Sequence, residues 1–185
     1  LRPADEFPMD FSGTSGFSNS ANTLFLQTAH LDRYFTSAEG VIDEVRADEK
    51  AWKKMVGISR DAATAITGMM RRAYRRPPTH AEIKEIIARY EAELENKKPQ
   101  DEALANAFKA ILVSPNFLLR VENSVATAKD QEVSDFDLAT RLSYFLWAST
   151  PDDELLDAAA AGKLSDSTDR EAQVERMLAD PRSLS

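Results

Sequence analysis

The feature that most constrains the fold of this chain is a series of apolar stripes at helical spacing. Such spacing places the apolar side chains on one face of an α-helix. No run alternates apolar and polar residues long enough to indicate a strand. The sequence therefore predicts an all-α chain in which about six or seven helices form an irregular orthogonal bundle. The stripes fall at about residues 29–45, 59–74, 79–96, 101–112, 134–147, 151–160 and 168–180.

Start and stop signals bound most of these stripes. Thr79 and Glu82 fit a capping box, in which each side chain binds a backbone N–H of the other residue. Gly162 is expected just past a helix end, where a left-handed residue is common, and Pro77-Pro78 ends the preceding stripe. Residues 47–58 fit either a helix or a loop. Further N-caps are expected at Asp101, Ser114, Ser134, Thr150 and Thr168, with Pro115 and Pro151 each at a first helical position and Glu171 completing a second capping box.

The first 27 residues combine Gly, Pro, Ser and Asn with an unusual number of aromatic rings, Phe7, Phe11, Phe17 and Phe25. Aromatic rings bury large apolar areas, so we expect an N-terminal strap that packs on the helices. The chain is expected to be a piece of a longer protein. Residues 1–46 form the strap and first helix, 47–126 a central helical module, and 127–185 a C-terminal helical module packed with 47–126 as one unit; the first and last parts are expected to be truncated.

Composition excludes several classes of function. The chain of 185 residues has no cysteine, which excludes disulfides, cysteine-ligated metals and covalently attached haem c within it. Asp and Glu number 31 against 23 Lys and Arg. This acidic balance argues against a nucleic-acid partner, since binding nucleic acid requires neutralised phosphates. No apolar run approaches the roughly 20 residues that would span a bilayer.

Basic charge gathers in one part of the sequence. Residues 51–76 carry seven basic and one acidic side chains, and the densest stretch contains Arg71, Arg72, Arg75 and Arg76. One interpretation is a site for phosphate, sulfate or an acidic polymer. The other is a cation-rich helix end whose guanidinium groups pair with carboxylates of neighbouring helices. The second is favoured, because side chains at 100° steps point in several directions.

Other residues that could carry chemistry have simpler structural explanations. His30 and His80 lie in no metal-binding spacing, and no Gly-x-Ser-x-Gly motif occurs. Asp152 and Asp153 could form a carboxylate pair, but acids at the start of a helix are expected from its dipole. Trp147 is typical of a core or a domain interface. We therefore predict no catalytic, metal or cofactor-binding residue in this chain.

Several motifs together resemble a large, planctomycete-rich family of exported multidomain proteins of unknown function. The resemblance implies export to the periplasm or cell surface, and it implies no reaction, because no catalytic residues are established for the family. Longer members carry a c-type cytochrome domain with a Cys-x-x-Cys-His motif, so haem c would lie elsewhere in the parent protein. The motifs are residues 7–10 (Phe-Pro-Met-Asp), 16–19 (Gly-Phe-Ser-Asn), 71–77 (Arg-Arg-Ala-Tyr-Arg-Arg-Pro), 111–118 (Ile-Leu-Val-Ser-Pro-Asn-Phe-Leu) and 141–156 (Arg-Leu-Ser-Tyr-Phe-Leu-Trp-Ala-Ser-Thr-Pro-Asp-Asp-Glu-Leu-Leu).

The first hypothesis for function is a noncatalytic helical scaffold in a larger exported, haem c-associated protein. Its partners would be other domains of that protein or a redox partner. The alternative is a module of an enzyme that acts on an anionic polysaccharide, with Arg75, Arg76 and Arg141 as the anion-binding residues. A third hypothesis is a cytoplasmic helical adaptor. The candidate interaction surface comprises Arg71, Arg72, Arg75, Arg76, Arg141, Trp147, Asp152 and Asp153.

Overall fold

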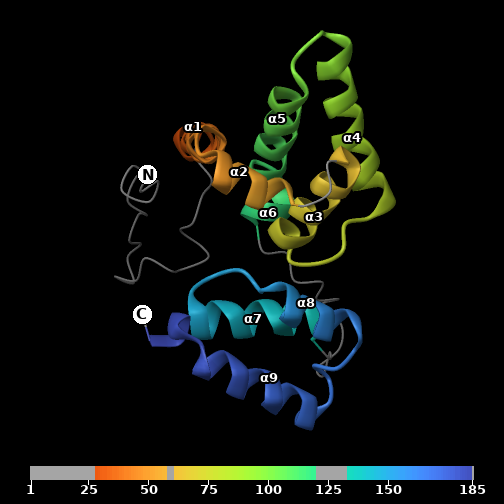
Figure 1. The fold of residues 1–185 in the computed structure, drawn as a ribbon. Helices are drawn as coiled ribbons and strands as arrows, with labels where there is room; N and C mark the ends of the chain where they lie inside the picture. Colours follow the sequence, from red (N-terminus) through yellow and green to blue (C-terminus); the bar gives the residue numbers. More distant parts are fainter. Residues whose placement is uncertain (1–27, 58–60, 120–132, 185) are drawn as a thin grey trace.

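The computed structural model describes residues 28–57, 61–119 and 133–184, and no strand occurs within these ranges, which confirms the all-α class (Figure 1). The proposed N-terminal strap lies outside the described residues. The helices are α1 (Thr28–Ala47), α2 (Glu49–Val56), α3 (Ala62–Tyr74), α4 (His80–Glu95), α5 (Gln100–Leu112), α6 (Pro115–Leu118), α7 (Asp135–Trp147), α8 (Asp153–Ala160), α9 (Ser167–Ala179) and the 3-10 helix η2 (Pro181–Leu184).

Several helix boundaries follow the local signals. Thr79 and Glu82 form the capping box of α4, and Ser114 caps α6 with Pro115 at its first position. Ser134 caps α7 by accepting from the N–H of Asp137. Gly162 follows α8 with a φ of 68°, and its N–H donates to the carbonyl of Ala159. This geometry is a Schellman end, which glycine adopts without the steric cost of a side chain.

Three expected N-caps were wrong. The N-cap of α5 is Pro99, which makes no side-chain bond, and Asp101 lies inside the first turn. Helix α8 is capped by Asp152, not Thr150, so Pro151 lies before the helix. Helix α9 is capped by Asp166, not Thr168, so no second capping box forms. In the last two cases an aspartate, which caps slightly better than threonine, lay two residues away.

The stretch at residues 47–58, for which a helix and a loop were both open, contains the helix α2. Asp48 caps it by accepting from the N–H groups of Lys50 and Ala51. Trp52, on its inner face, is buried against Phe108 with ring centroids 5.7 Å apart. The described part of the chain has more helices than the six or seven expected, because α2 and the four-residue helix α6 add to them.

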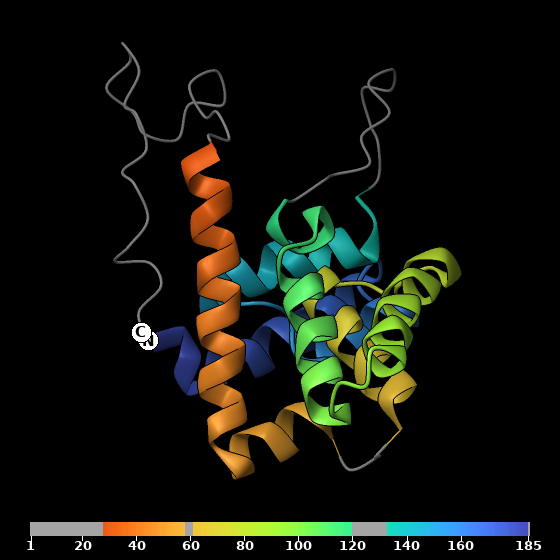
Figure 2. The same cartoon turned by 90° about the horizontal axis from the view of Figure 1, so that it is seen from above.

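Helices α1 to α6 share one apolar core. Helices α4 and α5 form a hairpin, and α3 packs against both (Figure 1). Figure 2 shows α1 lengthwise beside this group, where its Ile42 is fully buried. The centre of the core consists of the fully buried side chains Ile42, Ile66, Met70, Phe108 and Ile111.

Helices α7, α8 and α9 enclose a second, smaller core that shares no residue with the first. Trp147 and Ala139 of α7 meet Leu155 of α8 and Met177 of α9, and Leu164 from the α8–α9 turn closes it. The carboxylate of Asp135 holds this turn to the start of α7, because it accepts from the N–H of Leu164 at 2.8 Å and from the hydroxyl of Ser165.

The two groups of helices meet where α8 faces α3 (Figure 1). Arg71 of α3 binds the carboxylates of Asp153 and Asp157 of α8 at 3.4 and 2.6 Å. Leu156 lies near Asp153 on the surface of α8, since residues three apart share a helix face. Leu156 is 0% exposed and is therefore a fully buried apolar side chain of α8 that lies outside both cores.

Candidate functional site

Arg75 ends α3 in a left-handed conformation with a φ of 59°, and its side chain turns back into the protein. The residue is only 8% exposed. Its guanidinium group donates to the carbonyls of Phe117, Asn116 and Leu119 at 3.1, 3.0 and 3.2 Å. These carbonyls surround the end of α6, where backbone acceptors lack helical partners. Arg75 thus fastens α6 to α3 and presents little of its charge to solvent.

Arg76 makes a two-pronged ion pair with Glu82 of α4. The two nitrogen–oxygen distances are 3.0 and 2.7 Å, and Nη2 of Arg76 also donates to the side chain of Asn116 at 3.3 Å. The hydrogen bond from Arg76 is the main reason why the pKa of Glu82 falls to about 2, with further help from Thr79. Arg76 therefore joins the α3–α4 turn to α4 and α6.

Arg71 and Arg72 leave α3 in different directions. Arg71 bridges to α8 through Asp153 and Asp157, as described above. Arg72 points toward α2, where one nitrogen lies 3.5 Å from the carbonyl oxygen of Met55. The four arginines of the basic segment therefore do not converge on one anion site.

Trp147 is a core residue with a polar anchor. It is 4% exposed, and its Nε1 donates to the carbonyl of Met177 at 3.0 Å. The guanidinium group of Arg182, in η2, lies 3.6 Å from the centroid of the indole ring, and that of Arg176 lies at 5.6 Å. Cations placed over an indole face are attracted by its quadrupole. Trp147 thus holds α7, α9 and η2 together.

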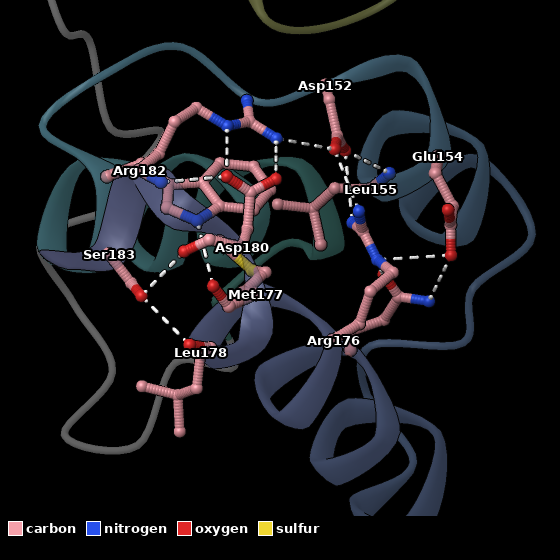
Figure 3. Close-up of polar contacts among 11 residues, drawn as sticks. Asp152, Glu154, Leu155, Arg176, Met177, Leu178, Asp180, Arg182 and Ser183 are labelled. Atoms are coloured by element: carbon pink, nitrogen blue, oxygen red, sulfur yellow. Dashed lines mark hydrogen bonds and ion pairs between the residues drawn. The ribbon is translucent and has the colours of Figure 1, made fainter.

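Asp152 links the start of α8 to α9 (Figure 3). Its carboxylate accepts from the N–H of Leu155 at 3.0 Å and from Arg176 at 2.8 and 3.1 Å. Arg182 approaches the same carboxylate at 3.4 Å. Burial by itself raises the pKa of Asp152, but the bonds from Arg176, Leu155 and Arg182 outweigh it and the pKa lies below its ordinary value.

Arg182 is held in place by the residue that follows α9. Its side chain donates to the two carboxylate oxygens of Asp180 at 2.9 and 2.7 Å (Figure 3). The hydrogen bond from Arg182 lowers the pKa of Asp180 to about 2. Asp180, Arg182, Asp152 and Arg176 therefore form one charged network around the edge of Trp147.

The remaining candidates do not add a reactive group. Asp153 and Arg141 are exposed, on α8 and α7 respectively, and His80 is exposed at the first position of α4. His30 belongs to α1. Among the residues that the structure describes, no three His, Asp or Glu side chains are grouped as metal ligands. The absence of cysteine means that this chain has no Cys-x-x-Cys-His motif for haem c.

Sequence reasoning missed the partners that give these residues their roles. Arg176, Asp180 and Arg182 surround Trp147, yet they lie about 30 positions away along the chain, where only the tertiary fold can pair them. Glu82 was recognised as half of a capping box, but its bond to Arg76 was not foreseen. The short Asp180-Pro181-Arg182 sequence is the one local signal that could have suggested an ordered turn after α9.

Most residues of the candidate interaction surface make contacts within the chain. Arg71, Arg75, Arg76, Trp147 and Asp152 all bind other parts of the chain. This arrangement can hold helices together. None of the helices in the described ranges is long and apolar enough to cross a membrane.

Comparison with known proteins gives three matches along the chain. Residues 1–47 match the family model PSD3, Protein of unknown function (DUF1587). Residues 61–122 match PSD5, Protein of unknown function (DUF1595), and residues 133–185 match PSD4, Protein of unknown function (DUF1592). Helix α2 lies between the first two matches. No curated protein and no solved structure matches the chain. In three consecutive segments, the chain thus matches families that are described only as proteins of unknown function.

Proposed function

We propose that this chain is a noncatalytic helical scaffold module within a larger exported, haem c-associated protein. The observation that carries the proposal is that the side chains best suited to bind a ligand contact other parts of the chain. Three residues that could have formed a site bind other segments of the chain instead: Arg75 binds α6, Arg76 binds α4 and α6, and Trp147 binds α9 and η2. A module whose polar and aromatic side chains connect its own helices is rigid, and a rigid module is suited to holding other domains at fixed positions.

Two further facts support this proposal. The three family matches follow each other in one chain, as expected of a piece of a multidomain protein. The family that the sequence motifs resemble includes longer, exported members with a c-type cytochrome domain, which is a natural partner for this module. Because this chain lacks cysteine, any haem c would belong to that other domain.

The first test uses the parent protein. We expect the parent reading frame to encode an export signal and a Cys-x-x-Cys-His motif, and the purified parent to show the Soret absorption band of haem c. A parent with neither the motif nor the band would contradict the haem association, and a parent kept in the cytoplasm would contradict export.

The second test asks whether the module binds the cytochrome domain. Isothermal titration of this chain with the separately produced domain should show saturable binding. We would first vary α7, where Phe145 is 86% exposed and Tyr144 lines an apolar pocket of about 290 Å³ with Arg75, Phe117, Leu118 and Leu119. Phe145→Ser should weaken binding, whereas Leu178→Ser, an exposed position on α9, should not. Absence of binding would contradict the scaffold role.

The polysaccharide alternative requires Arg75 and Arg76 to face a ligand. Their guanidinium groups are engaged with α6 and Glu82, respectively. A heparin or carrageenan titration at low ionic strength distinguishes the two functions, because a polyanion site would bind there and lose affinity steeply with added salt. We expect no such binding through Arg75, Arg76 or Arg141.

A further inference from the structure

Two cations on the walls of one pocket, Lys54 and Arg72, have no carboxylate partner in the described part of the chain. Arg71 and Arg76 form ion pairs, Arg75 binds carbonyls, and Lys53 pairs with Glu49 at 2.5 Å. Neither Lys54 nor Arg72 takes part in an ion pair among the described residues. These two side chains therefore carry positive charge that no carboxylate of the described residues pairs with.

Lys54 and Arg72 line the same pocket, which has a volume of about 190 Å³. The last residues of α2 form one wall and α3 forms the other, and the two helices are neighbours in the fold (Figure 2). Thr64, Gly68 and Arg72 are spaced by four residues, so they follow one face of α3. Gly68 has no side chain, and a Cβ there would meet only Arg72 Nη1, at 4.0 Å. The glycine thus leaves space beside the guanidinium group.

The hydrogen-bonding capacity of this pocket is mostly unused. A guanidinium group has five N–H donors, and within the described ranges Arg72 makes one weak bond, the 3.5 Å contact with the carbonyl of Met55. Arg72 is also half-buried, where an ionic bond is screened less than in open water. Lys54 adds three donors from the opposite wall. A pocket of this volume accommodates more than one water, each of which occupies roughly 30 Å³.

The one acid in the sequence of the basic segment, Asp61, is engaged at the start of α3. Asp61 is the N-cap of α3, and its carboxylate accepts from the backbone N–H and the hydroxyl of Thr64 at 2.9 and 2.6 Å. These bonds hold its charge at the N-terminus of α3, about three helical turns from Arg72. Asp61 should therefore reduce the affinity of the pocket for an anion without neutralising the pocket.

We propose that the pocket between α2 and α3 binds a small oxyanion through Arg72 and Lys54. The ligand class is a phosphate, sulfate or carboxylate group, because these groups match the planar donors of arginine and the ammonium charge of lysine. This site goes beyond the scaffold function, which requires no ligand. It also uses none of Arg75, Arg76 and Arg141, so it is separate from the polysaccharide alternative.

Nuclear magnetic resonance of the ¹⁵N-labelled chain tests the site directly. Inorganic phosphate, inorganic sulfate and acetate would be added in three separate titrations, with sodium chloride at matched ionic strength as the reference. The bound oxyanion should shift the amide signals of Gly57, Thr64 and Gly68 in a saturable way that chloride does not reproduce. Saturation with phosphate and sulfate identifies a tetrahedral anion as the ligand, and saturation with acetate alone identifies a carboxylate.

Variants test which residues bind. Lys54→Gln should weaken binding about tenfold, and so should Arg72→Gln, since each removes a charged hydrogen bond. Lys53→Gln is the matched control, because Lys53 lies beside Lys54 on α2 but does not line the pocket. Asp61→Asn keeps the N-cap and removes the acid, so it should tighten binding. The proposal is overturned if no oxyanion saturates the signals, or if Lys53→Gln weakens binding as much as Lys54→Gln does.

Discussion

At the scale of single residues, the arginines of this chain act through their partners. Arg75 binds three carbonyls at the end of α6, Arg76 binds both oxygens of Glu82, and Arg182 stacks on Trp147. Each role uses the flat, fixed donor geometry of the guanidinium group, which lysine cannot reproduce. The same residue type thus supplies a backbone anchor, an ion pair and an aromatic contact.

Replacing Trp147 with alanine should destabilise the fold by about 3–5 kcal/mol, since the change removes a buried indole and leaves a cavity. It also removes the donor to Met177 and the surface on which Arg182 lies. Urea denaturation followed by circular dichroism would measure the loss. Phe145→Ala, two positions away but 86% exposed, is the control and should change stability by less than about 0.5 kcal/mol. Equal effects would show that Trp147 is not a core residue.

Glu82 should make stability depend on pH in acid. Its pKa is about 2 in the folded chain against an ordinary 4.5, so below pH 4.5 the unfolded state binds the proton more readily. The contribution of Glu82 is therefore complete above pH 4.5 and is lost as the pH falls to about 2. We expect it to be about 1–2 kcal/mol, because solvent partly screens the pair.

Urea midpoints at several pH values between 5 and 2 would check this prediction. Glu82→Gln retains a side chain that suits the third position of a capping box but cannot titrate. Its stability should fall less with acid than that of the unmodified chain. Asp180 titrates in the same range in both proteins, so its effect cancels in the difference. Parallel curves for the two proteins would contradict the assigned role of Glu82.

At the scale of elements, the caps of α8 and α9 show how context changes the value of one residue type. Asp152 and Asp166 are both N-caps. Among the described residues, Asp166 accepts hydrogen bonds from backbone N–H groups alone. Asp152 also binds the side chains of Arg176 and Arg182. One aspartate therefore starts a helix, and the other also joins that helix to its neighbours.

Asp152→Ala should cost about 2–4 kcal/mol, because it removes a cap and leaves partly buried guanidinium groups without their acceptor. Asp166→Ala should cost about 1 kcal/mol, the ordinary value of a cap. Thermal and urea unfolding of the two variants gives the comparison. Similar losses would indicate that the bonds of Asp152 to α9 and η2 contribute little stability.

Two glycines should respond to alanine with opposite signs. Gly162 has a φ of 68°, so Gly162→Ala should destabilise the end of α8 by about 1 kcal/mol. Gly68 lies inside α3 with space for a methyl group, so Gly68→Ala should stabilise by about 0.5–1 kcal/mol. Shifts in the urea midpoint measure both effects. A loss of stability in Gly68→Ala would mean that the pocket beside Arg72 is tighter than the structure indicates.

At the scale of the whole molecule, the two cores behave as one unit if contacts between their helices, such as that between α3 and α8, hold them together. The bonds from Arg71 to Asp153 and Asp157 join α3 to α8, and Leu156, on the same helix α8, is fully buried. The ion pairs lie at the surface and contribute little by themselves. Leu156 should therefore provide most of the coupling between the two groups of helices.

The two tryptophans report on the two cores separately, since Trp52 lies in the first and Trp147 in the second. In the unmodified chain we expect one urea transition at both probes. Leu156→Ala should separate the transitions, because we expect this buried side chain to pack between the two groups of helices. Fluorescence of Trp52→Phe and Trp147→Phe backgrounds would assign each transition to a core. Leu155→Ala, whose side chain belongs to the second core alone, should mainly lower the Trp147 transition.

The sequence by itself determined the all-α class and most helix positions. Helical spacing and capping depend on residues a few positions apart, so Thr79 with Glu82, Ser134 and Gly162 could be interpreted correctly from local pattern. It was harder to predict which of two neighbouring capping residues begins a helix. The starts of α8 and α9 were therefore misplaced by about two residues. These errors arose where two good capping residues lay within one turn of each other.

Only the tertiary structure decided what the charged and aromatic residues do. The ion pair of Arg71 spans more than 80 positions, and the hydrogen bond of Trp147 spans 30. No local pattern encodes such pairings, because they depend on how helices with similar apolar faces pack. The same packing separates Lys54 and Arg72 from the carboxylates that neutralise their neighbours, and so creates the one pocket for which we propose a ligand.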